Sequence, residues 1–254
     1  MRYKILVYLL ISFFLYSCAS EKRYNIEKTK SHKEIAEIYI QENKYTEALE
    51  ELKLAKQTDK CDPEIYNLLG VVYMGKYEFN KAEENLKEAI RLDPNFSEAY
   101  NNLGSLMMLQ KRYIEAIKYF KKALQNPYYT NAYIAKTNLG WAYYQLGEKK
   151  KAINVLLDAM RENPRYPRVL NYLGLIYFKE GDLKSAKFYF KQSLKLDKIS
   201  GEARYYLGEI YFREGNSEFA KEIWQSIIYL APESEWANKA TEKIYFLEKM
   251  SSNS

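Results

Sequence analysis

Few residues in this chain are suited to covalent chemistry. Cysteine occurs only at Cys18 and Cys61, and histidine only at His32. No HExxH, CxxC or GxSxG pattern occurs, so the sequence offers no recognisable zinc site, redox pair or nucleophile turn. Adjacent carboxylates such as Glu83 and Glu84 point about 100° apart on a helix, which is typical of a solvated surface. We therefore expect no enzyme, no cofactor and no metal site.

Cys18 ends an apolar segment that begins after two basic residues. The apolar run covers residues 5–16 and is shorter than the ~20 residues of a membrane-spanning helix, so it is typical of a secretory signal. The letters LYSC at residues 15–18 resemble the bacterial lipobox, although Tyr16 stands where the family usually has a small residue. The resemblance implies a signal peptide over residues 1–17 and acylation of Cys18, for example with palmitate. The alternative is a plain signal or anchor helix with an incidental cysteine.

A lipoprotein signal bears on compartment and partners. Ala19 follows the cysteine in place of the aspartate that retains such lipoproteins at the inner membrane, so we expect the periplasmic face of the outer membrane. Residues 18–28 then form the acylated cysteine and a short linker. Removal of Arg2 and Lys4 with the signal lowers the formal charge from +6 to +4, and an exported chain of this charge has no reason to bind nucleic acid.

A period of about 34 residues runs through the remaining sequence. A leucine and a glycine are followed by an aromatic residue, and an alanine lies twelve positions after the glycine. The first set forms one stripe of an amphipathic helix and the alanine begins a stripe on a second helix. Because a mid-helix glycine costs about 1 kcal/mol relative to alanine, its recurrence indicates that the two helices approach closely there. The glycines are Gly70, Gly104, Gly140, Gly174 and Gly208, and the alanines are Ala82, Ala116, Ala152, Ala186 and Ala220.

This pattern resembles the tetratricopeptide repeat. The resemblance implies an all-α, right-handed superhelical solenoid of about six repeats, in which Ala36 replaces the glycine of the first repeat. A final amphipathic segment is expected to cap the array. The expected repeats are 29–62, 63–96, 97–130, 133–166, 167–200 and 201–234, with a capping helix over 235–249 and a tail over 250–254.

A partner-binding groove is expected along the first helix of each pair. Residues three before, one after and four after the glycine share a stripe that solenoid curvature turns inward. The stripe combines amides, which could bond a peptide backbone, with large side chains that could anchor its side chains. The alternative is that the large residues serve packing alone. The candidate binding residues are Asn67, Met74, Asn101, Met108, Trp141, Tyr144, Asn171, Phe178, Tyr205 and Phe212.

The combination of features resembles a known class of lipoprotein. A lipidated cysteine, about six repeats and the 237 residues left when 17 are removed from 254 are similar to the pilotins of type IV pili. The resemblance implies that the chain helps the pilus secretin reach the outer membrane and form its ring, and that it binds no small-molecule substrate. The alternative is a lipid-anchored adaptor for other envelope proteins, such as cell-wall hydrolases. A soluble chaperone adaptor is disfavoured, because Glu37 stands where the carboxylate clamp of such adaptors needs asparagine.

Overall fold

The computed structural model describes residues 26–251, and their regular structure is helical throughout. The predicted all-α fold class is confirmed, since no strand occurs within this range. The proposed signal peptide and Cys18 lie outside the described residues. Within them, no helix is both long and apolar enough to cross a membrane. The chain divides into two compact units between Tyr129 and Thr130, which we call the N-terminal unit and the C-terminal unit.

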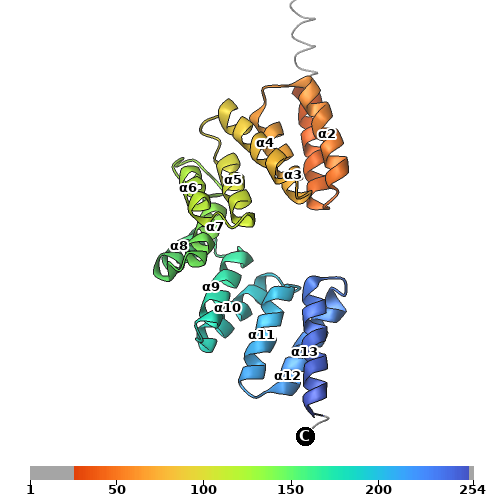
Figure 1. The fold of residues 1–254 in the computed structure, drawn as a ribbon, viewed down its shortest axis with the longest axis vertical. Coiled ribbons are helices and arrows are strands. Elements are labelled where there is room, and N and C mark those ends of the chain that lie inside the picture. The colour runs from red at the N-terminus through yellow and green to blue at the C-terminus, as the bar shows by residue number, and fades with distance from the viewer. Residues whose placement is uncertain (1–25, 252–254) are drawn as a thin grey trace, which may run out of the picture. The chain divides into compact units, whose positions relative to one another are not determined.

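In the N-terminal unit, consecutive helices pack against one another in pairs (Figure 1). We call the leading helix of each pair the first helix and its partner the second helix. Close pairing joins α3 to α4 and α5 to α6, while α2 packs on α3 and α4 packs on α5. The helices are residues 26–41, α2 (Tyr45–Thr58), α3 (Pro63–Gly75), α4 (Phe79–Leu92), α5 (Ser97–Leu109) and α6 (Tyr113–Ala123).

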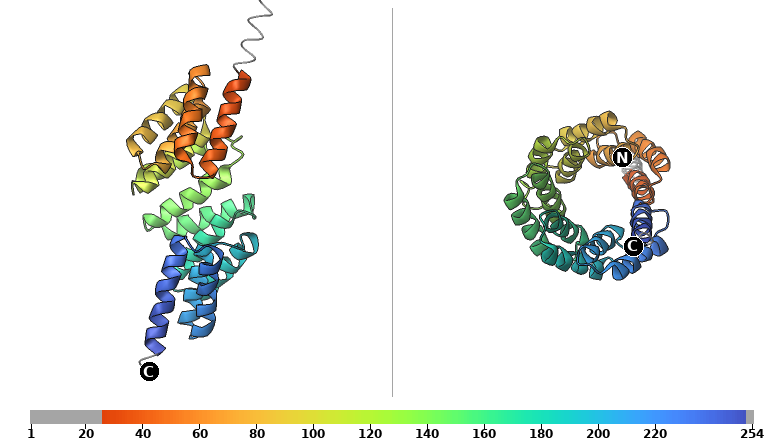
Figure 2. Two further views of the ribbon diagram at one scale, coloured as in Figure 1. Left: turned by 90° about the vertical axis from the view of Figure 1, so that its right-hand side faces the viewer. Right: turned by 60° about the horizontal axis from the view of Figure 1, so that its bottom comes forward.

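The C-terminal unit contains three such pairs and a final helix. The first helices α7, α9 and α11 each pack on the helix that follows, and α13 packs on both α12 and α11. Figure 2 shows α13, in dark blue, beside these two helices. The helices are α7 (Ala132–Gln145), α8 (Lys149–Glu162), α9 (Pro167–Lys179), α10 (Leu183–Leu196), α11 (Gly201–Arg213), α12 (Ser217–Leu230) and α13 (Glu235–Ser251).

The repeated glycine lies where a large side chain of the second helix presses on the first. A Cβ on Gly70 would lie 2.5 Å from Leu86 Cγ, and one on Gly208 would lie 2.4 Å from Trp224 Nε1. These distances are far below contact distance, so the predicted close approach of the helices is confirmed. The structure adds the residue responsible, which follows the glycine by sixteen positions and is almost fully buried. In chain order these residues are Leu86, Phe120, Leu156, Phe190 and Trp224.

The turn between the helices of a pair uses a left-handed residue seven positions after the glycine. In the C-terminal unit this residue is a glycine, with φ between 79° and 83° at Gly147, Gly181 and Gly215. In the N-terminal unit the same conformation falls on side-chain-bearing residues, with φ of 58° to 59° at Asn43, Tyr77 and Lys111. The two units therefore make one turn geometry from different residue types.

Candidate functional site on the first-helix face

The candidate binding residues of the N-terminal unit lie on the face formed by its first helices, which we call the first-helix face. Met74 and Met108 are partly exposed, whereas Asn67 and Asn101 are only 7% and 8% exposed. The Asn67 Oδ1 atom accepts a hydrogen bond from Asn102 Nδ2 at 2.8 Å, which links α3 to α5. Asn67, an amide predicted to meet a partner, therefore also joins neighbouring repeats. The partly exposed candidates on this face are the two methionines, whose side chains can adapt their shape.

The first-helix face of the C-terminal unit begins with stacked aromatic rings. Trp141 on α7 lies 4.6 Å from Tyr172 on α9 and 5.4 Å from Tyr144, measured between ring centroids. Lys179 Nζ lies 5.7 Å and 5.9 Å from the Trp141 and Tyr144 rings. A ring face held in this way is a rigid anchor for an apolar or cationic side chain.

Further aromatic contacts continue this face across α9, α11 and α13. Phe178 is 8% exposed and meets the Tyr206 ring at 5.1 Å, with the Arg213 guanidinium 4.3 Å from its own ring centre. Tyr206 also lies 6.0 Å from Trp236 on α13. Of the remaining candidates, Tyr205 contacts Trp236 at 5.5 Å, and Phe212 contacts the buried Trp224 at 6.2 Å. The candidate aromatic residues thus come together through rings that lie outside the predicted stripe.

The tyrosines of this face are partly buried phenols. Burial raises the pKa of Tyr144, Tyr172, Tyr205 and Tyr206 above the ordinary phenol value. A neutral phenol both donates and accepts hydrogen bonds. The face therefore offers apolar rings with polar edges, which suits recognition of a peptide.

One polar contact at equivalent positions of neighbouring first helices differs in charge between the two units. In the N-terminal unit, Lys33 Nζ donates to Asp62 Oδ2 at 2.7 Å and also to Glu64 Oε2. Burial lowers the Lys33 pKa, but the two carboxylates outweigh it and the pKa is raised overall. In the C-terminal unit, Asn171 Nδ2 donates to Glu202 Oε2 at 3.0 Å. The first contact is an ion pair and the second joins a neutral amide to a carboxylate.

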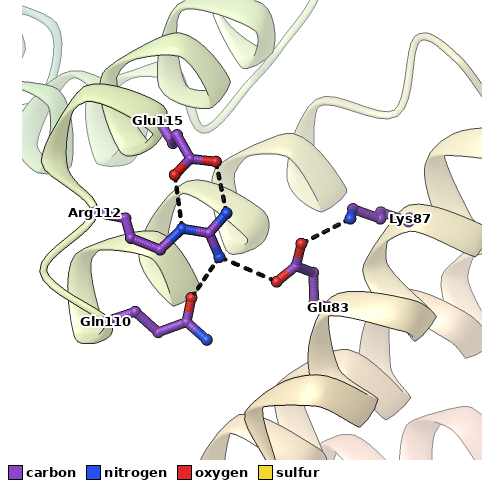
Figure 3. A network of polar contacts seen from close by, with 5 residues as sticks. All are labelled: Glu83, Lys87, Gln110, Arg112 and Glu115. Carbon is purple, nitrogen blue, oxygen red and sulfur yellow. Dashed lines mark hydrogen bonds and ion pairs between the residues drawn. The ribbon is translucent and has the colours of Figure 1, made fainter.

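The second helices of the N-terminal unit carry a charged network (Figure 3). The Arg112 guanidinium donates to both oxygens of Glu115, at 2.7 Å and 2.6 Å, and to Gln110 Oε1 at 2.8 Å. It also reaches Glu83 on α4 at 3.3 Å, and Glu83 pairs with Lys87 at 2.7 Å. The hydrogen bond from Lys87 is the main cause of a lowered pKa of Glu83. This network fastens α4 to the α5–α6 turn and includes none of the candidate residues.

Two of the residues first considered for chemistry, His32 and Cys61, lie among the described residues, and no hydrogen bond joins them. His32 Nδ1 lies 2.6 Å from Glu51 Oε2, and Cys61 is an exposed thiol. Among residues 26–251, no cluster of three or more histidine, cysteine or acidic residues is arranged to hold a metal ion. Within the C-terminal unit, the first-helix face combines rigid rings, hydroxyls and amides, which are groups that peptide-recognition surfaces use.

Comparison with models of known protein families also finds repeats in this chain. Models described as tetratricopeptide repeat match residues 63–96, 95–161, 137–189 and 177–242, and one described as TPR repeat matches residues 36–76. The chain is a tetratricopeptide-repeat protein. Arrays of such repeats present extended surfaces to protein partners, so this protein is a protein-interaction scaffold. A search among curated proteins finds no match.

Solved structures share the fold of this tetratricopeptide-repeat protein over most of its length. PilF of Pseudomonas aeruginosa is 20% identical, with a TM-score of 0.69 over 86% of this chain and 99% of PilF. PilW, described as a widely conserved type IV pilus biogenesis factor, is 24% identical, with a TM-score of 0.72 over 84% of this chain and 98% of PilW. Cut9 in the APC/C complex Cut9–Hcn1 is 17% identical, with a TM-score of 0.72 over 84% of this chain and 42% of that chain.

Sequence reasoning missed several residues of the C-terminal first-helix face. Tyr172 and Tyr206 follow the predicted amide position by one residue, and Trp236 was assigned only to the cap. The signal was tyrosine at this place in two successive repeats, while the three earlier repeats have Leu68, Asn102 and Asn138 there. It could not be separated from core aromatics, because a 3.6-residue period leaves adjacent positions near the edge of a stripe ambiguous.

Proposed function

We propose that this tetratricopeptide-repeat protein is a lipid-anchored scaffold on the periplasmic face of the outer membrane that assists assembly of the type IV pilus secretin. The observation that carries the proposal is the likeness of fold to PilF and PilW over nearly all of those chains, 99% and 98%. PilW is a type IV pilus biogenesis factor by its description. The lipobox-like residues 15–18 support the same assignment.

In this proposal the anchor and the repeats have separate tasks. A single acyl chain holds a protein only marginally at a membrane, while two or more hold it stably, so Cys18 would carry several. The residues between Cys18 and the first helix, 19–25, can span about 25 Å at most, which keeps the repeats close to the bilayer. A secretin segment lies along the first-helix face, and its side chains contact the rings around Trp141. Holding several subunits near the membrane raises their local concentration and favours the multimer.

Replacing Cys18 tests the anchor. Cys18→Ser should move the protein from the membrane fraction to the soluble fraction while its far-UV circular dichroism stays unchanged, because the acylated atom is lost and the repeats are not touched. The wild-type protein is the control. A variant that stays tightly membrane-bound would exclude the lipobox interpretation.

A deletion strain tests the pilus role. Secretin multimers that resist detergent, and surface pili, should be lost on deletion and restored by the wild-type gene. Trp141→Ala should restore neither, while the protein remains folded, because the substitution removes the ring that stacks on Tyr172 and Tyr144. Tyr229→Ala is the matched control, since Tyr229 is 86% exposed on the second helix α12. A deletion that alters cell shape and leaves pili intact would favour an adaptor for cell-wall hydrolases instead.

A further inference from the structure

A cleft of about 580 Å³ opens within the C-terminal unit, where the first turns of α9 and α11 meet the start of α13. The aromatic rings of Tyr172 and Trp236 line it together with three charged side chains, Arg168, Asp197 and Glu202. Only Asn171 among its lining residues belongs to the stripe predicted from sequence. The other lining residues are Tyr166, Pro167, Ser200 and Gly201.

The polar groups of the cleft are incompletely paired. Asn171 is 8% exposed, and while its Nδ2 donates to Glu202, its buried Oδ1 has no hydrogen-bond partner among the described residues. No ion pair reaches Glu202 from any described residue within 4.0 Å. A half-buried carboxylate beside an unpaired amide oxygen leaves two acceptors without enough donors, which is costly unless a ligand supplies them.

The N-terminal unit contains the same pair of positions with the missing charge in place. Lys33 lies three residues before Ala36, as Asn171 lies three before Gly174, and Glu64 and Glu202 each lie six before the next repeat's glycine. Lys33 Nζ bonds both Glu64 and Asp62. An internal cation therefore occupies the first site, whereas asparagine at the equivalent position leaves the second carboxylate without a directly paired cation.

We infer that the cleft between α9, α11 and α13 binds a basic side chain, arginine or lysine, from a protein partner, with the Glu202 carboxylate as its counter-ion. This inference rests on the proposed function only in that a protein partner lies along the first-helix face. A cation in this position pairs with Glu202 as Lys33 does with Glu64. The Trp236 and Tyr172 rings line the cleft, and aromatic rings favour cations. Lys239 Nζ of the chain already lies 4.0 Å from the centre of the Trp236 ring, which leaves the Tyr172 ring for a partner's cation. Burial raises the pKa of Glu202.

Two cations of the chain compete for this carboxylate from nearby. Arg168 on α9 and Lys239 on α13 both act to lower the pKa of Glu202 without forming an ion pair with it. Lys239 is instead paired with Glu235 at 3.3 Å. Removing the Arg168 charge should therefore strengthen binding of an external cation, whereas a merely structural cleft would show no such gain.

The test is peptide binding to the full-length chain in detergent micelles, labelled with 5-fluorotryptophan. The chain has three tryptophans, so ¹⁹F NMR gives one signal for the cleft at Trp236, one for the aromatic stack at Trp141, and one for the core at Trp224, which is 1% exposed. The probes are a capped Ser-Gly-Arg-Gly-Ser peptide and its citrulline twin, which has the same shape and no charge. The arginine peptide should shift the Trp236 signal saturably, and the citrulline peptide should not.

Three variants make the result specific. Glu202→Gln keeps the bond to Asn171 and should weaken binding of the arginine peptide by about tenfold or more, as expected for loss of a charge-assisted hydrogen bond. Asn171→Lys should do the same by supplying the internal cation that Lys33 supplies in the N-terminal unit. Arg168→Gln should tighten binding. All three should keep the wild-type circular dichroism.

Several outcomes would overturn the inference. They are no shift of Trp236 in the wild type, equal shifts with the two peptides, undiminished binding by Glu202→Gln, or weaker binding by Arg168→Gln. The experiment contains no pilus component, so its failure leaves the secretin test untouched. Equally, a deletion strain with normal pili would exclude the pilus role without changing the expected peptide binding.

Discussion

The N-terminal unit and the C-terminal unit share one helix-pair design, but their first-helix faces differ. The N-terminal face has Met74 and Met108 with paired amides, whereas the C-terminal face has stacked rings around Trp141 and Tyr206. Methionine adapts its shape and rigid aromatic rings do not. The difference shows that a few packing positions define the repeat, while residues one or two positions away are free to determine what each unit binds.

At the turns between paired helices, the two units share one backbone conformation but use different residue types. Left-handed backbone is adopted at equal positions in both units, yet only the C-terminal unit places glycine there. A side-chain-bearing residue in this conformation costs about 1–2 kcal/mol. The packing of the helix pair therefore imposes the turn conformation. The residue type at the turn only determines how much free energy that conformation costs.

The largest expected effect is the loss of stability when the repeat glycine is replaced by alanine, and it should differ between the two units. Gly208→Ala should lower the free energy of unfolding by about 2–3 kcal/mol through overpacking, because Trp224 is rigid and its Nε1 donates to Tyr205 O at 3.1 Å. Gly70→Ala should cost only about 1 kcal/mol, since the flexible Leu86 can move and alanine favours the helix. Urea unfolding followed by circular dichroism measures both. Equal costs would contradict this ranking of the two contacts.

Substitutions at the left-handed turn residues should change stability by an intermediate amount, with opposite sign in the two units. Gly181→Ala should destabilise by about 1 kcal/mol through its backbone alone, because an added Cβ at Gly181 has no neighbour within 4 Å. Lys111→Gly should relieve the same cost, although greater freedom of the unfolded chain offsets part of the gain. Thermal unfolding midpoints provide the measurement. A lower midpoint for Lys111→Gly would show that the lysine side chain, and not the backbone conformation, matters at that turn.

The smallest expected effect concerns the charge in the C-terminal cleft. Burial raises the folded-state pKa of Glu202 above its unfolded value, so ionisation costs stability as the pH rises through that interval. Asn171, Arg168 and Lys239 oppose this shift, and Glu235 reinforces it. Glu202→Gln should therefore be slightly more stable than wild type at neutral pH, and the gain should disappear below the unfolded pKa of glutamate, about 4.3.

Differential scanning calorimetry of wild type and Glu202→Gln across this pH range measures the effect. Glu64→Gln is the matched variant in the N-terminal unit. It should be destabilising at neutral pH, because it removes an ion-pair partner of Lys33. The same sign for both variants would contradict the proposed difference in charge between the two sites.

Much of the repeat architecture could be predicted from sequence. The spacing of Gly70 through Gly208 predicted both the helix pairs and their close approach, because a side chain is excluded there by local geometry that every repeat shares. The candidate aromatic residues Trp141, Tyr144 and Phe178 also lie on one face as expected. Whether they bind a partner stays a prediction.

The partners of the candidate amides could not be predicted. Asn67 bonds Asn102, and Asn171 bonds Glu202 thirty-one residues later. These contacts depend on which side chain the following repeat presents at one exact height along its helix. Amphipathic periodicity specifies a helix face and carries no information about that height.

By itself, the sequence determined the helical period, the glycine positions and the apolar segment before Cys18, because each follows from residue type and spacing along one chain. Only the tertiary structure decided that Lys33 neutralises Glu64 while Glu202 has no ion-pair partner among the described residues. The two sites have equivalent sequence positions and acidic residues. Their difference arises from the side chain that the preceding helix places opposite each carboxylate, and electrostatic pairing depends on that distance in space.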